Sequence, residues 1–184
     1  MKVEWHHVVA AGVTTALALT DTQAVRALPN TPDRVRYSSA VSRAGAIYTI
    51  GGVVVGSVLV AKLADKPEAL QRSLVGGRAV ISAAIATAAL KPIFGRERPD
   101  INDANGRFWK ARDGFPSGHA MMSWAVATAV ARRPGCPKWL AITSYIAATG
   151  ISLSRVGAQR HFPADIVAGG FLGALIGSRL ARHP

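Results

Sequence analysis

The chain has 184 residues, enough to bury one hydrophobic core, so we expect a single domain over residues 1–184. Its formal net charge of +12 would suit nucleic-acid binding, but the basic residues stand at the ends of apolar segments and the aromatic residues do not interleave with them. This pattern disfavours a nucleic-acid partner and fits a membrane surface or an anionic substrate.

The N-terminal part consists of an apolar segment followed by a polar one. Residues 8–19 are apolar but lack a strong basic start and a clear cleavage site, so we do not interpret them as a signal peptide. Residues 21–43 are polar, and Pro29, Asn30 and Pro32 predict a loop there.

The expected motif-bearing core of the domain covers about residues 44–182, and residues 1–43 form an N-terminal helix and loop. Residues 44–61 carry no charge and approach the roughly 20 residues that a membrane-spanning helix needs. A polar connection with a short helix is expected over 62–78, followed by an alanine-rich helix over 79–90.

Residues 95–114 form the longest polar stretch of the chain. Strand signals are weak because alternation of apolar and polar residues is absent. The sequence therefore predicts an all-α bundle of about six helices, most of them membrane-spanning. The last three helices are expected over residues 118–131, 139–153 and 163–180.

Glycines recur four residues apart in two of these helices. Gly169, Gly173 and Gly177 share one face of the last helix, and Gly52 and Gly56 repeat the spacing earlier. Such spacing lets two helix backbones approach closely, as helices commonly do in lipid. The mean hydropathy of only +0.23 leaves a tightly packed soluble bundle as the alternative.

A cation, an imidazole and a carboxylate lie close together in the sequence SRVGAQRHFPAD, which contains Arg155, His161 and Asp165. Asp165 is the only carboxylate residue after Asp113, and an unpaired acid beside an apolar run is costly to desolvate. Its obvious partner is His161, because a carboxylate on one ring nitrogen leaves the other free to attack an electrophile. An ordinary helix start beside an incidental histidine is the alternative.

Two further motifs carry possible phosphate chemistry. The sequence KPIFGRERP offers Lys91 as a point charge and Arg98 as a planar fork for phosphate oxygens. The sequence PSGH places the backbone N–H groups of Ser117, Gly118 and His119 at a helix N-terminus, where anions bind readily. Taken separately, each has a simpler interpretation, a solvated basic loop and an ordinary serine N-cap.

Together the three motifs, K-x6-R-P, P-S-G-H and S-R-x5-H-x3-D, resemble the type 2 phosphatidic acid phosphatase superfamily in order and in internal spacing. That superfamily includes lipid phosphate phosphatases, bacterial non-specific acid phosphatases and vanadium haloperoxidases. The resemblance implies a nucleophilic His161 oriented by Asp165, with His119 as the general acid. It also implies that the phosphoryl oxygens are held by Lys91, Arg98, Ser117, Gly118 and Arg155.

The implied activity is a phosphatase reaction without a metal or another cofactor. Three cationic side chains can stabilise the charge that develops during phosphoryl transfer. The sequence DINDANG lacks the spacing of a calcium loop, and the histidines form no zinc pattern. We therefore expect activity in the presence of a chelator.

The main hypothesis is a multi-pass phosphatase of a bacterial-type inner membrane. Its substrate would be a lipid phosphate or pyrophosphate, such as phosphatidic acid, phosphatidylglycerol phosphate or an isoprenyl pyrophosphate. By resemblance the site faces the periplasm or the exterior. Phe108, Trp109 and Lys110 would either lie at the lipid interface or belong to a solvated loop with one packed aromatic side chain.

Three other hypotheses stay open on the sequence alone. The first is a soluble or peripheral periplasmic acid phosphatase with the same chemistry. The second is a vanadate-dependent peroxidase, and the third is a membrane scaffold without activity. The sequence leaves the oligomeric state open.

Overall fold

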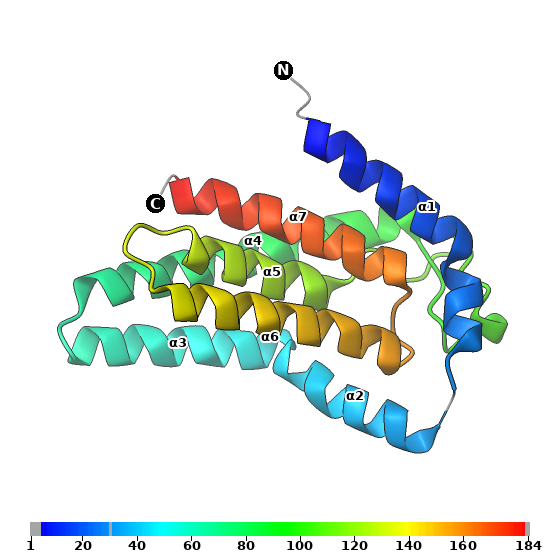
Figure 1. Ribbon diagram of the computed structural model, residues 1–184, viewed down its shortest axis with the longest axis horizontal. Coiled ribbons are helices and arrows are strands. Elements are labelled where there is room, and N and C mark those ends of the chain that lie inside the picture. The colour runs from blue at the N-terminus through cyan, green and yellow to red at the C-terminus, as the bar shows by residue number, and fades with distance from the viewer. Residues whose placement is uncertain (1–4, 30, 183–184) are drawn as a thin grey trace.

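The computed structural model describes residues 5–29 and 31–182, and Figure 1 shows how their helices are arranged. The prediction of an all-α bundle is confirmed, since this part of the chain contains no strand. Seven α-helices and one short 3₁₀ helix follow one another: α1 (Trp5–Ala27), α2 (Pro32–Ala44), α3 (Ile47–Leu63), α4 (Pro67–Phe94), η1 (Asn102–Ala104), α5 (Gly118–Ala131), α6 (Lys138–Gly157) and α7 (Pro163–Arg182).

The loop predicted over residues 21–43 is wrong, because most of this segment is helical. α1 continues to Ala27, and α2 begins at Pro32 after the N-cap residue Thr31, whose side chain accepts a hydrogen bond from the Arg34 amide at 3.4 Å. Proline suits the first turn of a helix, where no partner for its missing N–H is needed. Pro32 therefore marked a helix start, whereas Pro29 lies in the short connection between α1 and α2, where a loop was correctly expected; Asn30 lies outside the described residues.

The break predicted between residues 78 and 79 is also wrong. α4 runs without interruption from Pro67 to Phe94, so its polar first turns and the apolar segment that follows them form one helix. Pro92 is accommodated in the last turn. The helix ends at Gly95, which has a positive φ of 49° and donates a hydrogen bond from its amide to the Lys91 carbonyl at 2.8 Å. Together these features form a left-handed C-cap.

α5 is the central helix, with nine of its fourteen residues buried. α7 lies directly against it, because a methyl group on Gly169 would stand 2.5 Å from the Ser117 carbonyl oxygen. Methyl groups on Gly173 and Gly177 would overlap carbonyl oxygens one and two turns further along α5. The predicted close approach at these glycines is confirmed, and the partner helix is α5.

The same interpretation is wrong for the earlier pair of glycines. Methyl groups on Gly52 and Gly56 would meet nothing within 4 Å, so no described element packs on that face of α3. The spacing alone did not distinguish a packed helix face from an open one.

Four helical segments are long and apolar enough to cross a membrane, judged by length and composition in the described part of the chain. Large apolar side chains are exposed along helix faces, including Ile81 and Ile85 of α4 and Ile142 and Ile146 of α6. Such outward-facing stripes are expected of helices surrounded by lipid. The four segments are Val8–Ala27, Pro32–Leu63, Pro67–Phe94 and Pro163–Arg182.

The two connections that carry the motifs lie at the same end of the bundle. α4, α5, α6 and α7 alternate in direction, so the α4–α5 and α6–α7 connections meet at the end near α1 in Figure 1. The α3–α4 and α5–α6 turns lie at the other end.

Candidate active site

His161 is buried in the α6–α7 connection and joined to the α4–α5 connection. Its Nδ1 lies 2.7 Å from the carbonyl oxygen of Gly114. A carbonyl can only accept, so Nδ1 carries the hydrogen and Nε2 keeps its lone pair. Burial lowers the pKa of His161 despite the opposing effect of Asp165, so the ring is neutral at neutral pH. This tautomer is the form that a nitrogen nucleophile needs.

Asp165 lies beside the ring of His161, but its shortest bonds go elsewhere. Its Oδ2 stands 3.6 Å from Nδ1 of His161 and accepts the Phe162 amide at 2.7 Å. Its Oδ1 accepts a hydrogen bond from Arg96 at 2.7 Å. As the sequence predicted, Asp165 and His161 are neighbours. The sequence did not indicate that a peptide carbonyl is the nearer partner of the ring.

Lys91 and Arg98 converge on a single oxygen atom. Oδ2 of Asp113 lies 2.6 Å from Nη2 of Arg98 and 3.4 Å from Nζ of Lys91. Partial burial opposes ionisation of Asp113, but Arg98 and Lys91 outweigh it and lower the pKa of this carboxyl group. Two side chains expected to hold phosphate thus already hold an anion, which the sequence did not predict.

His119 stands among the other predicted site residues, in the first turn of α5 and outside the four candidate spans. Burial is the largest of the effects that together lower the pKa of His119 to about 3, and Arg155, His161, Lys91 and Arg98 contribute the rest. All four groups are therefore within electrostatic range of this imidazole. Arg155 is in turn held by a hydrogen bond to Ser42 of α2.

Ser117 and Gly118 are buried at the start of α5. The Ser117 hydroxyl accepts from the Ala120 amide at 3.5 Å, which is the ordinary N-cap that the sequence left open. The Ser117 amide donates to the Asp165 carbonyl at 3.0 Å, so this N–H is not free for phosphate. A methyl group on Gly118 would stand 2.9 Å from Cγ2 of Thr87, which explains the need for glycine.

Arg96 is the main side chain that sequence reasoning missed. It is fully buried, with its guanidinium 4.7 Å from the ring centre of Phe108 and 4.2 Å from that of Phe162. Besides Asp165, it donates two bonds to Asp21 of α1, at 3.1 and 2.9 Å. An acid within the apolar α1 was the available signal, by the same reasoning that singled out Asp165.

The α4–α5 connection is held in shape by a second ion pair. Glu97 accepts hydrogen bonds from Arg107 at 3.1 Å and from Asn102 at 2.7 Å, and the bond from Arg107 lowers the pKa of Glu97. Phe108 packs against Phe115 at 5.6 Å between ring centres, whereas Trp109 is 77 % exposed. One aromatic side chain is therefore packed and its neighbour is presented outward.

Two apolar grooves run along the bundle. A groove of about 330 Å³ lies between α3, α5 and α6, lined at one end by Ala44 and Ile151. A methyl group on the neighbouring Gly45 would overlap Ile151 and stand 3.3 Å from Cδ2 of His119, so this groove opens beside the site. The other groove, of about 390 Å³, lies between α5, α6 and α7.

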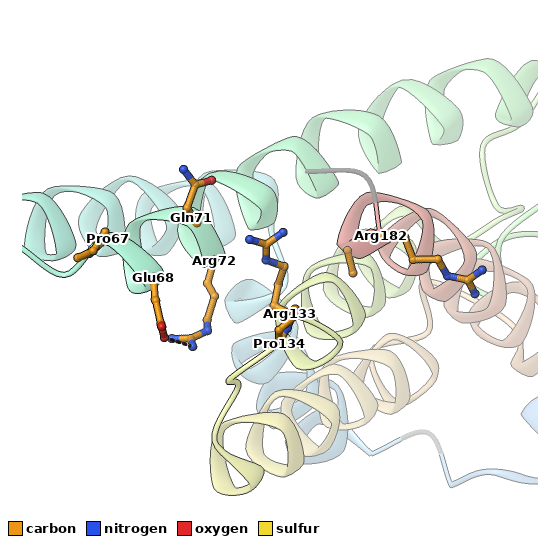
Figure 2. A pocket seen from close by; sticks show the side chains of 8 residues that line it. Pro67, Glu68, Gln71, Arg72, Arg133, Pro134 and Arg182 are labelled. Carbon is orange, nitrogen blue, oxygen red and sulfur yellow. Dashed lines mark hydrogen bonds and ion pairs between the residues drawn. The ribbon is translucent and has the colours of Figure 1, made fainter.

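A hollow of about 470 Å³ lies at the opposite end of the bundle, where Figure 2 shows Arg72, Arg133 and Arg182. Arg72 donates to Glu68 at 3.1 Å and to the Gly135 carbonyl at 2.7 Å, so it ties the α5–α6 turn to α4. No predicted site residue lines this hollow. Across residues 5–29 and 31–182, no group of three or more histidine, cysteine or acidic residues could hold a metal ion.

Comparison with known protein families identifies the family to which the chain belongs. The sequence model of the PAP2 superfamily matches residues 75–182, more than half of the chain. The chain belongs to the PAP2 superfamily. The resemblance drawn from the three motifs is thereby confirmed.

Individual relatives agree with this assignment. The chain is 31 % identical over 114 residues to a lipid A 1-phosphatase from Porphyromonas gingivalis, a match that covers 58 % of the chain. It spans only 24 % of the length of that relative.

Two crystal structures share the fold. One is a transmembrane PAP2-type phosphatidylglycerolphosphate phosphatase from Bacillus subtilis, with a TM-score of 0.69 at 20 % identity, covering 96 % of this chain and 90 % of that one. The other is LpxE from Aquifex aeolicus, with a TM-score of 0.67 at 19 % identity, covering 90 % and 94 %. The apolar helices and this shared fold indicate an integral membrane protein.

Proposed function

We propose that this PAP2 protein is a phosphatase that hydrolyses a lipid phosphate or pyrophosphate through a phosphohistidine intermediate on His161. The observation that carries the proposal is that Lys91 and Arg98 meet at one oxygen of Asp113 and, with Arg155, act electrostatically on His119, while Nδ1 of His161 is bound by a carbonyl and its Nε2 keeps a lone pair. Fixed cations of this kind stabilise the charge on the equatorial oxygens during phosphoryl transfer.

The first chemical step would transfer the phosphoryl group to the protein. Nε2 of His161 attacks phosphorus in line, and the bond from phosphorus to the lipid oxygen breaks. The pKa of His119 is about 3 without substrate, so His119 takes up a proton from solvent when the phosphate dianion binds beside it. It then donates this proton to the departing oxygen, so the lipid leaves as a neutral alcohol, or as a monophosphate if the substrate is a pyrophosphate. Lys91, Arg98 and Arg155 hold the non-bridging oxygens, together with the Gly118 amide and the Ser117 hydroxyl, which accepts from Ala120 but can still donate its hydrogen.

The second step would release phosphate and restore the protein. His119, now neutral, takes a proton from a water molecule as that water attacks phosphorus, and the bond between phosphorus and Nε2 breaks. Asp165 faces the Nδ1 side of the ring and favours the imidazolium form of the intermediate. The chemistry that the residues supply needs no metal.

A lipid substrate is supported by the surroundings of the cluster. The groove between α3, α5 and α6 begins beside His119 and is mostly apolar, so it suits the hydrocarbon chain of a lipid whose phosphate binds the cations. The names of the relatives point the same way, since lipid A 1-phosphate and phosphatidylglycerol phosphate are both lipid phosphate esters. We propose that the site faces the periplasm or the exterior.

A substrate panel tests the activity. Purified protein in detergent and chelator is assayed for phosphate release from lipid phosphates, lipid pyrophosphates and water-soluble monoesters, with vanadate as the inhibitor. We expect vanadate-sensitive release from at least one lipid, more efficient than release from any soluble ester. The absence of phosphate release from all substrates would refute the proposed function.

A pair of tryptophan substitutions on α6 tests the binding of the hydrocarbon chain. Ala147 lines the groove beside His119, and Thr149 lines the groove between α5, α6 and α7; both residues are exposed. Ala147→Trp should raise KM for the lipid substrate but not for a soluble ester, whereas Thr149→Trp should change neither. The reverse result would move the hydrocarbon chain to the other groove.

A further inference from the structure

Asp21, Arg96 and Asp165 form a buried charged cluster that joins three separate parts of the chain. Asp21 comes from α1, Arg96 from the α4–α5 connection and Asp165 from the first turn of α7. The guanidinium of Arg96 donates to Asp21 at 2.9 and 3.1 Å and to Asp165 at 2.7 Å. All three side chains are at most 1 % exposed, so water does not screen them appreciably.

The geometry of the fork fixes the carboxylate of Asp165. Asp21 binds Nη1 and Nη2 of Arg96 together, which sets the plane of the guanidinium, and Nη1 then holds Oδ1 of Asp165. With Oδ1 held, Oδ2 faces Nδ1 of His161 at 3.6 Å. The position of Asp165 beside the reacting ring therefore depends on a residue of α1.

The charges of the cluster do not cancel. Two carboxylates and one guanidinium leave one net negative charge against the Nδ1 side of His161. When phosphorus bonds to Nε2, the ring becomes a cation, and a buried negative charge beside it stabilises that form. Without the carboxylate of Asp21, Arg96 would neutralise Asp165, and this stabilisation would be lost.

We propose that Asp21 is a positioning residue for phosphoryl transfer, acting on His161 through Arg96 and Asp165. This inference rests on the proposed function of His161. It assigns to α1, which carries none of the three motifs, a part in the reaction itself.

The test compares Asp21→Asn with Arg26→Gln. Asn has nearly the shape of Asp but no charge, and its NH2 group cannot accept a hydrogen bond from Arg96, so the variant removes the charge and one of the two bonds of the fork. Arg26 also ties α1 to the α4–α5 connection, through the Asp103 carbonyl at 2.9 Å and Oδ1 of Asn105 at 2.6 Å, but it does not touch the cluster. Arg26→Gln is therefore a matched control for the docking of α1.

For Asp21→Asn we expect kcat to fall by about 10- to 100-fold. This range is typical of outer residues that orient a functional side chain through hydrogen bonds. KM and the inhibition constant of vanadate should change by less than about threefold, because the phosphate-binding cations are intact. Arg26→Gln should leave kcat within about threefold of the wild type, since a surface substitution has a small effect.

The inference is overturned if folded Asp21→Asn keeps the kcat of the wild type, or if Arg26→Gln loses as much. If Asp21→Asn does not fold, Arg96→Lys keeps the charge but loses the fork, and it should show the same loss of kcat with unchanged KM. Failure of both variants to fold would assign the cluster to stability alone and also overturn the inference. A wild-type protein without phosphatase activity would instead refute the proposed function.

Discussion

The carboxylate of Asp113 forms ion pairs with two of the cations that would bind the substrate phosphate, so its removal should strengthen anion binding. In the absence of substrate its carboxylate holds Arg98 at 2.6 Å and Lys91 at 3.4 Å. A phosphate group that binds both side chains must first displace this carboxylate. We therefore expect Asp113→Asn to lower the inhibition constants of inorganic phosphate and vanadate.

The size of the effect follows from the exposure of the pair. The side chain of Asp113 is 54 % exposed, so water screens both contacts. An exposed ion pair contributes about 0.2–1 kcal/mol, so two such pairs predict a gain of about 2- to 30-fold in affinity. The gain should shrink as salt is added, because salt screens exposed charges.

The assay measures competitive inhibition of the hydrolysis of a soluble monoester at low and high salt. Asp103→Asn is the matched control, because it removes the same charge from an exposed position of the same connection. We expect no more than a small change in that variant. An unchanged or weaker affinity for phosphate in Asp113→Asn would refute the idea that Asp113 competes with substrate, and would indicate that it holds the cations in place.

The remaining predictions concern the two histidines and the glycine packing. His161→Ala should abolish turnover and the acid-labile phosphoprotein; because the ring is buried and bonded to the Gly114 carbonyl, the substitution should also lower the midpoint of thermal unfolding. Ordinary turnover would contradict the assignment of His161 as the nucleophile. Burial and the surrounding cations lower the pKa of His119 to about 3, and a bound phosphate dianion should raise it, so binding should take up a proton and tighten as the pH falls. Calorimetry in two buffers of different ionisation enthalpy measures this uptake, and it should be smaller in His119→Gln. Gly173→Ala should destabilise the fold by about 1–3 kcal/mol through overlap with α5, whereas Gly52→Ala should be neutral or stabilise by up to about 1 kcal/mol. Equal midpoints of chemical unfolding for these two variants would contradict the packing of α7 on α5.

The sequence predicted the helices best where apolar residues ran without interruption. The bounds of α5 agree with the prediction, and those of α7 differ by two residues. α2 was missed because its residues are polar and follow a proline, whereas the short helix expected within residues 62–78 was not recognised as the first turns of α4. A polar segment with a proline at its start can begin a helix, and only tertiary packing decides between helix and loop.

The candidate site shows a similar division. The motifs identified side chains with distinct chemistry, and the structure brings Lys91, Arg98, His119, Arg155 and His161 to one end of the bundle. The backbone carbonyl that holds His161, and the buried Arg96, could not be found in the same way. A carbonyl has no signature in a sequence, and an arginine among other basic residues does not reveal that it is buried.

The α5–α6 turn carries the only cysteine of the chain, Cys136, at the end of the bundle away from His161. α5 leads from the end that carries the proposed site to the end that carries Cys136, so in a bundle that spans the membrane the thiol and the site would lie on opposite sides. A maleimide that cannot cross membranes should label Cys136 in permeabilised cells but not in intact ones if the histidines face outward. The orientation of the protein is therefore accessible to a labelling experiment on the unmodified chain.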